Sequence, residues 1–240
     1  MLRKIVTRLY DRFADSEEVQ VYKMLHTRGF APDAIIDVGA YEGHWSTTAR
    51  SIFGPIPTLM VDAQAGKDAA LRRCSDAYED WTHEIALLGS EDGNEVSFYE
   101  METGSSMMPE RSDVSRKEVR IKTRRLDTLA AELPGRNLFL KLNVQGAELE
   151  VLKGAPETLK RAGLVQLETA VLSYNEGAPS MREVLAFMEE RGLSPIDIAG
   201  RVRIKNMLIQ IDLLFAPTGG ALRPDYFEWE TATSAIRSPS

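Results

Sequence analysis

The chain has 240 residues, 43% of them hydrophobic, so it is long enough to bury one substantial core and has the composition of an ordinary globular protein. Its net charge of -7 and pI near 5.2 disfavour a nucleic-acid partner, because binding to phosphates calls for a basic face. The single cysteine, Cys74, excludes an intrachain disulfide and a cysteine zinc site, and a lone thiol fits the reducing cytoplasm.

Residues 1–30 predict a helical appendage. Residues 2–13 place apolar side chains at helical spacing with basic residues between them, which is typical of an amphipathic helix. This helix either packs against the domain or a twin subunit, giving a homo-oligomer, or lies as a basic helix on a membrane surface. A second helix is expected from a cap at Asp15 to a stop at Gly29. No apolar stretch is long enough for a bilayer span, so we expect no integral membrane association.

Residues 31–217 predict one α/β domain, followed by a tail over residues 218–240. Short apolar runs alternate with helical segments, which is typical of a parallel sheet built from βαβ units. The runs cover residues 34–38, 58–61, 85–88, 138–142 and 164–167. Near the C-terminus, runs at 195–198 and 207–215 are separated by the polar stretch 200–206, and we expect them to form an antiparallel hairpin that closes the sheet.

An insertion is predicted between the third and fourth runs. Residues 95–99 and 118–122 alternate as half-exposed strands do, so they form either an inserted hairpin or a lengthened sheet edge. The polar loop between them, residues 101–116, is long enough to act as a lid over an acceptor.

The first predicted strand ends in a glycine-containing turn that runs directly into a helix, with Gly39 and Gly43 inside the segment 37–44. Gly39 can take the tight turn after the strand, and Gly43 removes a side chain where the loop closes over a ligand. The turn therefore predicts the ligand crevice of an open α/β sheet. It lacks the G-x-G-x-x-G spacing of a dinucleotide site, which disfavours the alternative of a nicotinamide-dependent oxidoreductase.

Acidic and aromatic side chains accompany this turn. Asp62 ends the second strand about 25 positions after Asp37, near the offset of a carboxylate that binds ribose hydroxyls. Asp37 can order the loop amides or face a cationic group of the ligand. Within the loop, Tyr41 can form a wall of the crevice and Glu42 is a further binding candidate, while Glu84 can contact the edge of a nucleobase.

Three stretches resemble the FkbM-type S-adenosylmethionine-dependent methyltransferases: residues 35–46, residues 84–99 and, above all, Leu140-Lys-Leu-Asn-Val-Gln-Gly-Ala-Glu-Leu-Glu-Val-Leu-Lys-Gly-Ala155. The resemblance implies a Rossmann-like class I methyltransferase fold, with a mostly parallel seven-stranded sheet and an antiparallel last strand. It implies S-adenosyl-L-methionine as cofactor and methyl transfer to oxygen, often on a sugar hydroxyl. The family usually has aspartate where this chain has Asn143, which can hydrogen-bond a hydroxyl or the cofactor but cannot take a proton and is a poor metal ligand, so we predict no metal site.

Methyl transfer to an alcohol needs a base for the hydroxyl proton. Glu168, at the end of the fifth strand, is our preferred candidate, with a carboxylate paired to lysine or arginine as the alternative interpretation. His44, just after Gly43, is the second candidate, because histidine titrates in the useful range. Glu148 is placed as an acid at a helix start. We predict an O-methyltransferase acting on a small molecule or a saccharide, and a cofactor-binding protein without catalysis is the remaining alternative.

Overall fold

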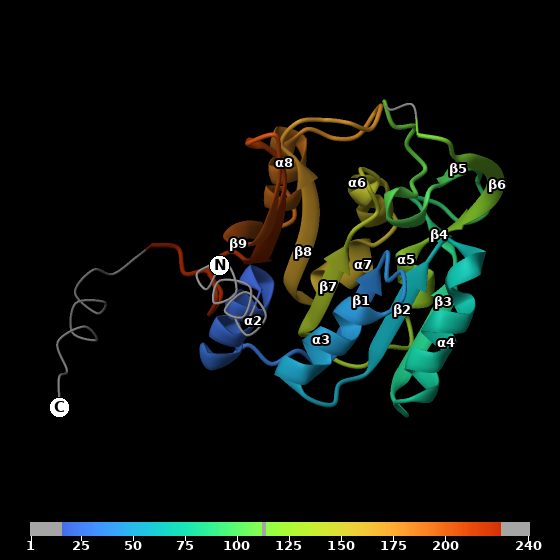
Figure 1. Ribbon diagram of the computed structural model, residues 1–240. Coiled ribbons are helices and arrows are strands. Elements are labelled where there is room, and N and C mark those ends of the chain that lie inside the picture. Colours follow the sequence, from blue (N-terminus) through green and yellow to red (C-terminus); the bar gives the residue numbers. More distant parts are fainter. Residues whose placement is uncertain (1–15, 112–113, 227–240) are drawn as a thin grey trace, which may run out of the picture.

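The computed structural model describes residues 16–111 and 114–226, in which helices cover both faces of a seven-stranded sheet (Figure 1). The strands of this sheet are β1 (Ala34–Val38), β2 (Thr58–Asp62), β3 (Trp81–Ile85), β7 (Leu138–Leu142), β8 (Ala162–Ala170), β9 (Leu193–Ile204) and β10 (Met207–Pro217). The helices are α2 (Glu17–Thr27), α3 (His44–Phe53), α4 (Asp68–Asp76), α5 (Leu126–Leu129), α6 (Glu148–Lys153), α7 (Pro156–Lys160) and α8 (Met181–Glu189). Two short 3-10 helices, η1 (Ala65–Lys67) and η2 (Glu102–Gly104), follow β2 and β5. The helix expected at residues 2–13, the cap at Asp15 and most of the tail lie outside the described residues.

The strand order confirms the expected fold. The sheet runs β3-β2-β1-β7-β8-β10-β9. Neighbouring strands from β3 to β8 are parallel, whereas β10 is antiparallel to both β8 and β9. The direction of winding reverses between β1 and β7, and in open α/β sheets a ligand crevice lies outside the carboxyl ends of the strands at such a point.

The insertion forms a second sheet with the order β4-β6-β5, made of β4 (Leu87–Leu88), β5 (Glu95–Glu100) and β6 (Lys117–Arg124). The run 85–88, expected as one strand, is therefore divided: Ile85 ends β3, and Leu87 and Leu88 pair with β6 instead. The chain leaves the large sheet at Ala86, whose N–H still bonds to the Asp62 carbonyl. The predicted inserted hairpin is therefore confirmed, and the alternative, a lengthened edge of the large sheet, is wrong.

The closing hairpin is longer than expected. The polar stretch 200–206 lies mostly in β9 rather than in a loop, and the turn itself consists of Lys205 and Asn206 with φ of 50° and 65°. Two residues with positive φ are what a tight hairpin turn requires. Because charged and apolar residues alternate before the turn, the segment can be a strand in spite of its polar composition.

Both faces of the sheet carry apolar cores. One core joins the sheet to α5, α6, α7 and α8, and the other joins it to α2 and α3. In α2, which is capped by Ser16 rather than by Asp15, Tyr22 and Leu25 are fully buried, and the Tyr22 ring meets Phe139 of β7 edge-on at 5.4 Å between centroids. Residues 17–27 are thus built into the core of the domain. No helix in the described parts of the chain has the length and apolar character for a bilayer span.

Candidate active site

A cleft with about 740 Å³ of empty space, the open space at its mouth included, lies at the carboxyl ends of β1, β2 and β7. Apolar side chains from β1, β2 and the small sheet form much of its wall. Its polar lining includes four sequence-predicted residues, namely Gly39, Tyr41, Asp62 and Asn143. The loop expected to be a lid contributes Glu102, Thr103, Ser105, Ser106 and Met107. The cleft therefore brings together the turn after β1, the end of β2 and the insertion.

Gly39 is required where the turn meets the loop after β7. It has a φ of +74°, and a Cβ placed on it would lie 1.9 Å from the backbone oxygen of Asn143. Gly43 also has a positive φ, of +77°, and a Cβ placed on it would lie 2.8 Å from the Sγ of Cys74. Gly43 does not line the cleft, so the space it leaves serves packing against α4 rather than the expected approach to a ligand.

Asp62 holds the turn from the neighbouring strand. Its Oδ2 accepts the backbone N–H of Tyr41 at 2.8 Å, and its Oδ1 accepts that of Gln64 at 2.9 Å. Burial raises the pKa of this carboxyl, and the two N–H bonds oppose the shift. Each carboxylate oxygen has a further lone pair, so the side chain can still accept hydroxyl donors from the cleft.

Tyr41 connects the turn to the loop after β5, whose residues 101–111 form the roof of the cleft. Its hydroxyl donates to Glu102 Oε2 at 2.7 Å, and the Nζ of Lys67 lies 3.5 Å from the centre of its ring. Lys67 also bonds to Glu102 at 3.1 Å and to Glu42 at 3.4 Å. Desolvation lowers the pKa of Lys67, but its hydrogen bonds to Tyr41, Glu102 and Glu42 outweigh this and raise the pKa above the ordinary value. Glu42 is thereby directed to Lys67 and does not line the cleft.

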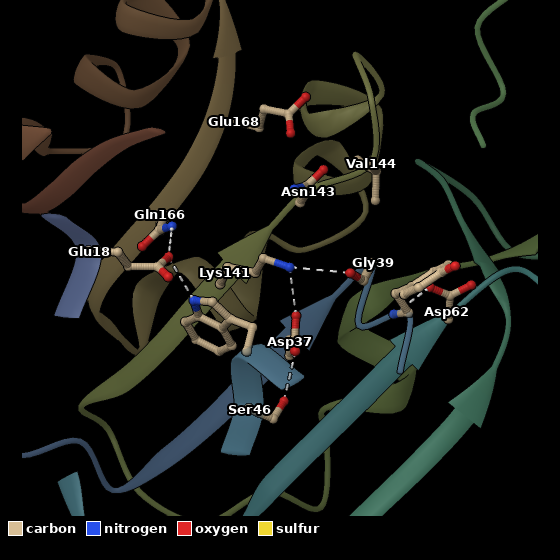
Figure 2. Close-up of polar contacts among 12 residues, drawn as sticks. Glu18, Asp37, Gly39, Ser46, Asp62, Lys141, Asn143, Val144, Gln166 and Glu168 are labelled. Atoms are coloured by element: carbon tan, nitrogen blue, oxygen red, sulfur yellow. Dashed lines mark hydrogen bonds and ion pairs between the residues drawn. The ribbon is translucent and has the colours of Figure 1, made fainter. Parts of the chain in front are cut away.

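Asp37 lies behind the turn, fully buried in β1. It accepts a hydrogen bond from Ser46 Oγ at 2.7 Å and forms an ion pair with Lys141 Nζ at 2.9 Å. Lys141 also donates to the carbonyl of Gly39 at 3.2 Å, so this lysine links Asp37 to the turn (Figure 2). Asp37 thus anchors Lys141. Its carboxylate does not line the cleft, although we expected that it could face a cationic group of the ligand there.

Glu168 lies on β8 beyond the end of β7, as Figure 2 shows. Its side chain is buried, and its hydrogen-bond partners in the described chain are neutral: Gln145 Nε2 lies 2.9 Å from each carboxylate oxygen, and the Tyr174 hydroxyl donates at 3.0 Å. Burial first, and the charge of Glu148 second, raise the pKa of Glu168 to about 8. The interpretation of Glu168 as an ordinary surface ion pair is therefore wrong.

Gln145 joins this carboxylate to the cleft and to the roof. It has a φ of 54°, which is unusual outside glycine and often marks a functional position. Its Nε2 also bonds to Asn143 Oδ1 at 2.7 Å, and its carbonyl accepts hydrogen bonds from Ser106 Oγ at 2.8 Å and Asn175 Nδ2 at 2.5 Å. One residue thus connects the candidate base, a cleft residue and two loops. The sequence prediction overlooked it.

The loop after β5 and the segment after β8 close over this region together. The N–H of Arg111 donates to the Tyr174 carbonyl at 2.9 Å, and the N–H of Glu176 donates to the Pro109 carbonyl at 2.7 Å. Figure 1 shows these segments meeting at the end of the sheet toward which β8 points. Residues 101–111 of the expected lid are therefore fastened to the segment 174–176 and form a roof.

Glu148, in the first turn of α6, is buried and serves the loop after β7. Its Oε1 accepts the N–H groups of Val144 at 3.1 Å and Gly146 at 3.2 Å. Burial raises the pKa of this carboxyl to about 7, and the backbone N–H bonds oppose that shift. Its placement at a helix start is confirmed.

A family model described as "Methyltransferase FkbM domain" matches residues 37–194, which include the turn, Asp62, the loop after β7 and Glu168. The chain belongs to the FkbM methyltransferase family. Its cofactor is S-adenosylmethionine, and the nicotinamide alternative finds no support. Among curated proteins, none matches this sequence significantly.

Several solved methyltransferases are distantly similar in structure to this FkbM methyltransferase. The magnesium protoporphyrin IX methyltransferase of Synechocystis PCC 6803, with bound SAM, has 11% identity and a TM-score of 0.46, over 84% of this chain and 78% of its own. The 1,6-didemethyltoxoflavin-N1-methyltransferase of Burkholderia thailandensis has 13% identity and a TM-score of 0.46, over 90% and 87%. A precorrin-6y C5,15-methyltransferase of Geobacter metallireducens has 13% identity and a TM-score of 0.44, over 78% and 80%. At these identities and scores, the likeness says nothing about the acceptor of the FkbM methyltransferase.

The cleft of this FkbM methyltransferase fits its cofactor chemically. Asp62 offers free lone pairs for the ribose hydroxyl groups, and the apolar wall offers a surface for the adenine ring. The absence of a side chain at Gly39 lets the turn pack directly against the Asn143 backbone at this edge of the sheet.

Two further sequence candidates, His44 and Glu84, also do not line this cleft. The His44 side chain is 86% exposed, with its Nε2 3.6 Å from Glu42, and it does not line the cleft, because α3 begins at this residue and directs it outward. Glu84 on β3 pairs with Arg124 at 3.1 Å and is 46% exposed. That His44 acts as a base and that Glu84 contacts the bound cofactor stay predictions.

Proposed function

We propose that this methyltransferase acts on a hydroxyl oxygen of a saccharide or small molecule, with Glu168 as the base. The observation that carries the proposal is a buried carboxylate at the carboxyl end of β8, surrounded by neutral partners and with a pKa raised to about 8. An alcohol is too weak an acid to ionise near neutrality, whereas amines and thiols do not need a strong base. Once ionised, a carboxylate with a raised pKa is a better proton acceptor than an ordinary glutamate, and its ionised fraction grows as the pH rises toward about 8.

The residues of the turn hold the cofactor in this proposal. Asp62 binds the ribose hydroxyls, Tyr41 forms a side of the cleft, and the backbone at Gly39 faces the amino-acid end. Glu42, Gly43 and Asp37 support the turn from outside the cleft, through Lys67, Cys74 and Lys141 respectively. When bound, S-adenosylmethionine supplies a methyl group already activated by its sulfonium.

The remaining chemistry falls to alignment and proton removal. Asn143 lines the cleft and is joined to Glu168 through the Gln145 amide. An acceptor hydroxyl takes the place of that amide, donates its proton to Glu168 and is oriented by Asn143 and Tyr174. The roof formed by residues 101–111 excludes water, which favours methyl transfer to the acceptor.

The test is methyl transfer from labelled S-adenosylmethionine to a panel of sugars, alcohols, amines and thiols. We expect labelled product with hydroxyl acceptors, and a loss of about 10²- to 10⁴-fold in kcat for Glu168→Gln with unchanged cofactor affinity. Glu157→Gln, an exposed glutamate on α7, is the matched control and should be fully active. Full activity of Glu168→Gln, or transfer to amines or thiols only, would contradict the proposal.

A further inference from the structure

A smaller pocket, which we call the second pocket, lies across the loop after β7 from the cleft. It contains about 300 Å³ of empty space, the open space at its mouth included, against about 740 Å³ in the cleft. Asn143, Val144 and Ala147 of this loop line the cleft. Gly146 and Glu148 of the same loop line the second pocket instead. The loop is therefore a wall between the two spaces.

Glu168, the candidate base, lies at this wall and lines the second pocket. Toward the cleft, Gln145 Nε2 bonds to both carboxylate oxygens of Glu168 at 2.9 Å and to Asn143 Oδ1 at 2.7 Å. Each carboxylate oxygen has more than one lone pair, so Glu168 can accept one donor from each side. A group in the second pocket and a group that replaces the Gln145 amide thus meet at the same carboxylate.

The second pocket contains a buried hydrogen-bond acceptor that lacks a donor. Asn175 lines the pocket and is 3% exposed, and its Oδ1 has no hydrogen-bond partner among the residues that the structure describes. The orientation of this amide is fixed, because its Nδ2 donates to the Gln145 carbonyl at 2.5 Å. A buried polar atom without a partner is costly, so a ligand that supplies a donor to Asn175 Oδ1 would be bound favourably.

The other polar side chains of the second pocket also call for a donor. Glu148 and Glu168 are buried, and no lysine, arginine or histidine is among the described residues that line the pocket. The side-chain donors are already used within the protein: the Tyr174 hydroxyl donates to Glu168 at 3.0 Å, and Thr169 Oγ1 donates to the Leu167 carbonyl at 3.3 Å. The pocket therefore selects a ligand group that donates hydrogen bonds.

The charge and the apolar part of the lining favour a hydroxyl group as that donor. Burial raises the pKa of Glu148 to about 7 and that of Glu168 to about 8, so near neutral pH the two acids carry less than two full negative charges. The pocket thus does not demand a cation. The rest of its lining is small and apolar, namely Ala170, Ala178, Pro179 and Val184. Such a surface suits the carbon atoms of an alcohol or a sugar ring.

We infer that the second pocket binds a hydroxyl group next to the one that is methylated, so that the acceptor is a vicinal diol, as on a sugar ring. The inference rests on the proposed function. The reacting hydroxyl donates to Glu168 in place of the Gln145 amide, and its neighbour donates to Asn175 Oδ1. The reacting oxygen forms its bond to the methyl carbon as the carbon–sulfur bond breaks, and its proton passes to Glu168. The neighbouring hydroxyl stays unchanged and fixes the orientation of the acceptor.

The experiment is an NMR titration of the full chain, loaded with S-adenosylhomocysteine, with cis-cyclohexane-1,2-diol, cyclohexanol and 2-aminocyclohexanol. The backbone amide signals of residues 174–178 report on the second pocket. We expect the diol to shift these signals with a dissociation constant at least about tenfold lower than that of cyclohexanol, because only the diol supplies the second donor. In methyl transfer from labelled S-adenosylmethionine, kcat/KM should favour the diol over cyclohexanol by a similar factor.

Two variants test the second pocket directly. Ala178→Val fills it without removing a hydrogen bond, and Asn175→Ala removes the acceptor that lacks a donor. Each should abolish the preference for the diol over cyclohexanol. The matched control, Ala186→Val, makes the same change at an exposed position on α8 and should keep the preference. Wild-type affinity for S-adenosylhomocysteine in calorimetry shows that Ala178→Val is folded.

Three results overturn the inference. One is equal binding of the diol and cyclohexanol to the wild type, or no shift with either, and another is an undiminished preference for the diol in both variants. The third is binding of 2-aminocyclohexanol at least about tenfold tighter than the diol, because the pocket would then be built for an ammonium group. Methylation of hydroxyl acceptors without preference for the diol refutes this inference alone. Transfer to amines or thiols only, with the diol still preferred in binding, refutes the proposed function and leaves the pocket assignment intact.

Discussion

Replacing Lys141 by methionine should destabilise the fold strongly, because it strands a buried carboxylate. Asp37 is fully buried, and its bonds are to Lys141 Nζ and to the hydroxyl of Ser46. Removing one partner of a buried ion pair typically costs about 3–5 kcal/mol. Lys141→Met also removes the hydrogen-bond donor to the Gly39 carbonyl, a loss of about 1 kcal/mol. The free energy of unfolding should therefore fall by about 4 kcal/mol or more.

The double variant Asp37→Asn/Lys141→Met separates the charge effect from the loss of the turn contact. It leaves no unpaired charge, so most of the stability should return, at least about 2 kcal/mol relative to the single variant. The Gly39 carbonyl still lacks its donor, so affinity for S-adenosylmethionine should remain below that of the wild type. Urea denaturation followed by circular dichroism, with calorimetry of cofactor binding, measures both effects. A single variant within 1 kcal/mol of wild type, or a double variant no more stable than the single, would refute this reasoning.

Three further predictions follow from the turn and the candidate base. Asp62→Ala should weaken S-adenosylmethionine binding by about 1–3 kcal/mol in calorimetry, and unchanged affinity would remove Asp62 from the ribose site. Gly39→Ala, whose Cβ would meet the Asn143 carbonyl, should lower the melting temperature and abolish cofactor binding, whereas Gly66→Ala, with open space around it and no positive φ, should do neither. Because the pKa of Glu168 is raised to about 8, its folded form holds a proton that the unfolded chain releases near pH 4.5, so stability should fall as pH rises between these values. Glu168→Gln should flatten that decline in denaturation curves, and an identical pH dependence would show that the pKa is not raised.

The turn after β1, the place of Asp62 at the end of β2 and the succession of strands along the chain could be predicted from the sequence, because each depends on local pattern. A buried five-residue strand followed by glycine specifies where a crevice opens, and Asp62 ends the next parallel strand at the same edge. The hairpin boundaries could not be predicted, because the stretch 200–206 is mostly polar and its residues 201–204 become a strand by pairing with β10. The backbone pairing with β10 stabilises a strand that the local β-propensity of these residues does not specify.

The polar contacts behind the cleft depend on residues far apart in the chain. Lys141 meets Asp37 across 104 positions, and Gln145 meets Glu168 across 23. A lysine within an otherwise buried apolar strand was the available sequence signal for Lys141, since such a residue needs a partner. No comparable signal exists for Gln145, whose position matters through its backbone φ and through contacts from two separate loops.

Calorimetric titration of the wild-type protein with S-adenosylmethionine and S-adenosylhomocysteine tests the central claim most directly. We predict one site per chain with dissociation constants in the micromolar range for both nucleosides. The cleft between β1 and β2 should account for that site, so Gly39→Ala should abolish the heat while Gly66→Ala retains it. Absence of binding to either nucleoside, or full binding by Gly39→Ala, would contradict the account.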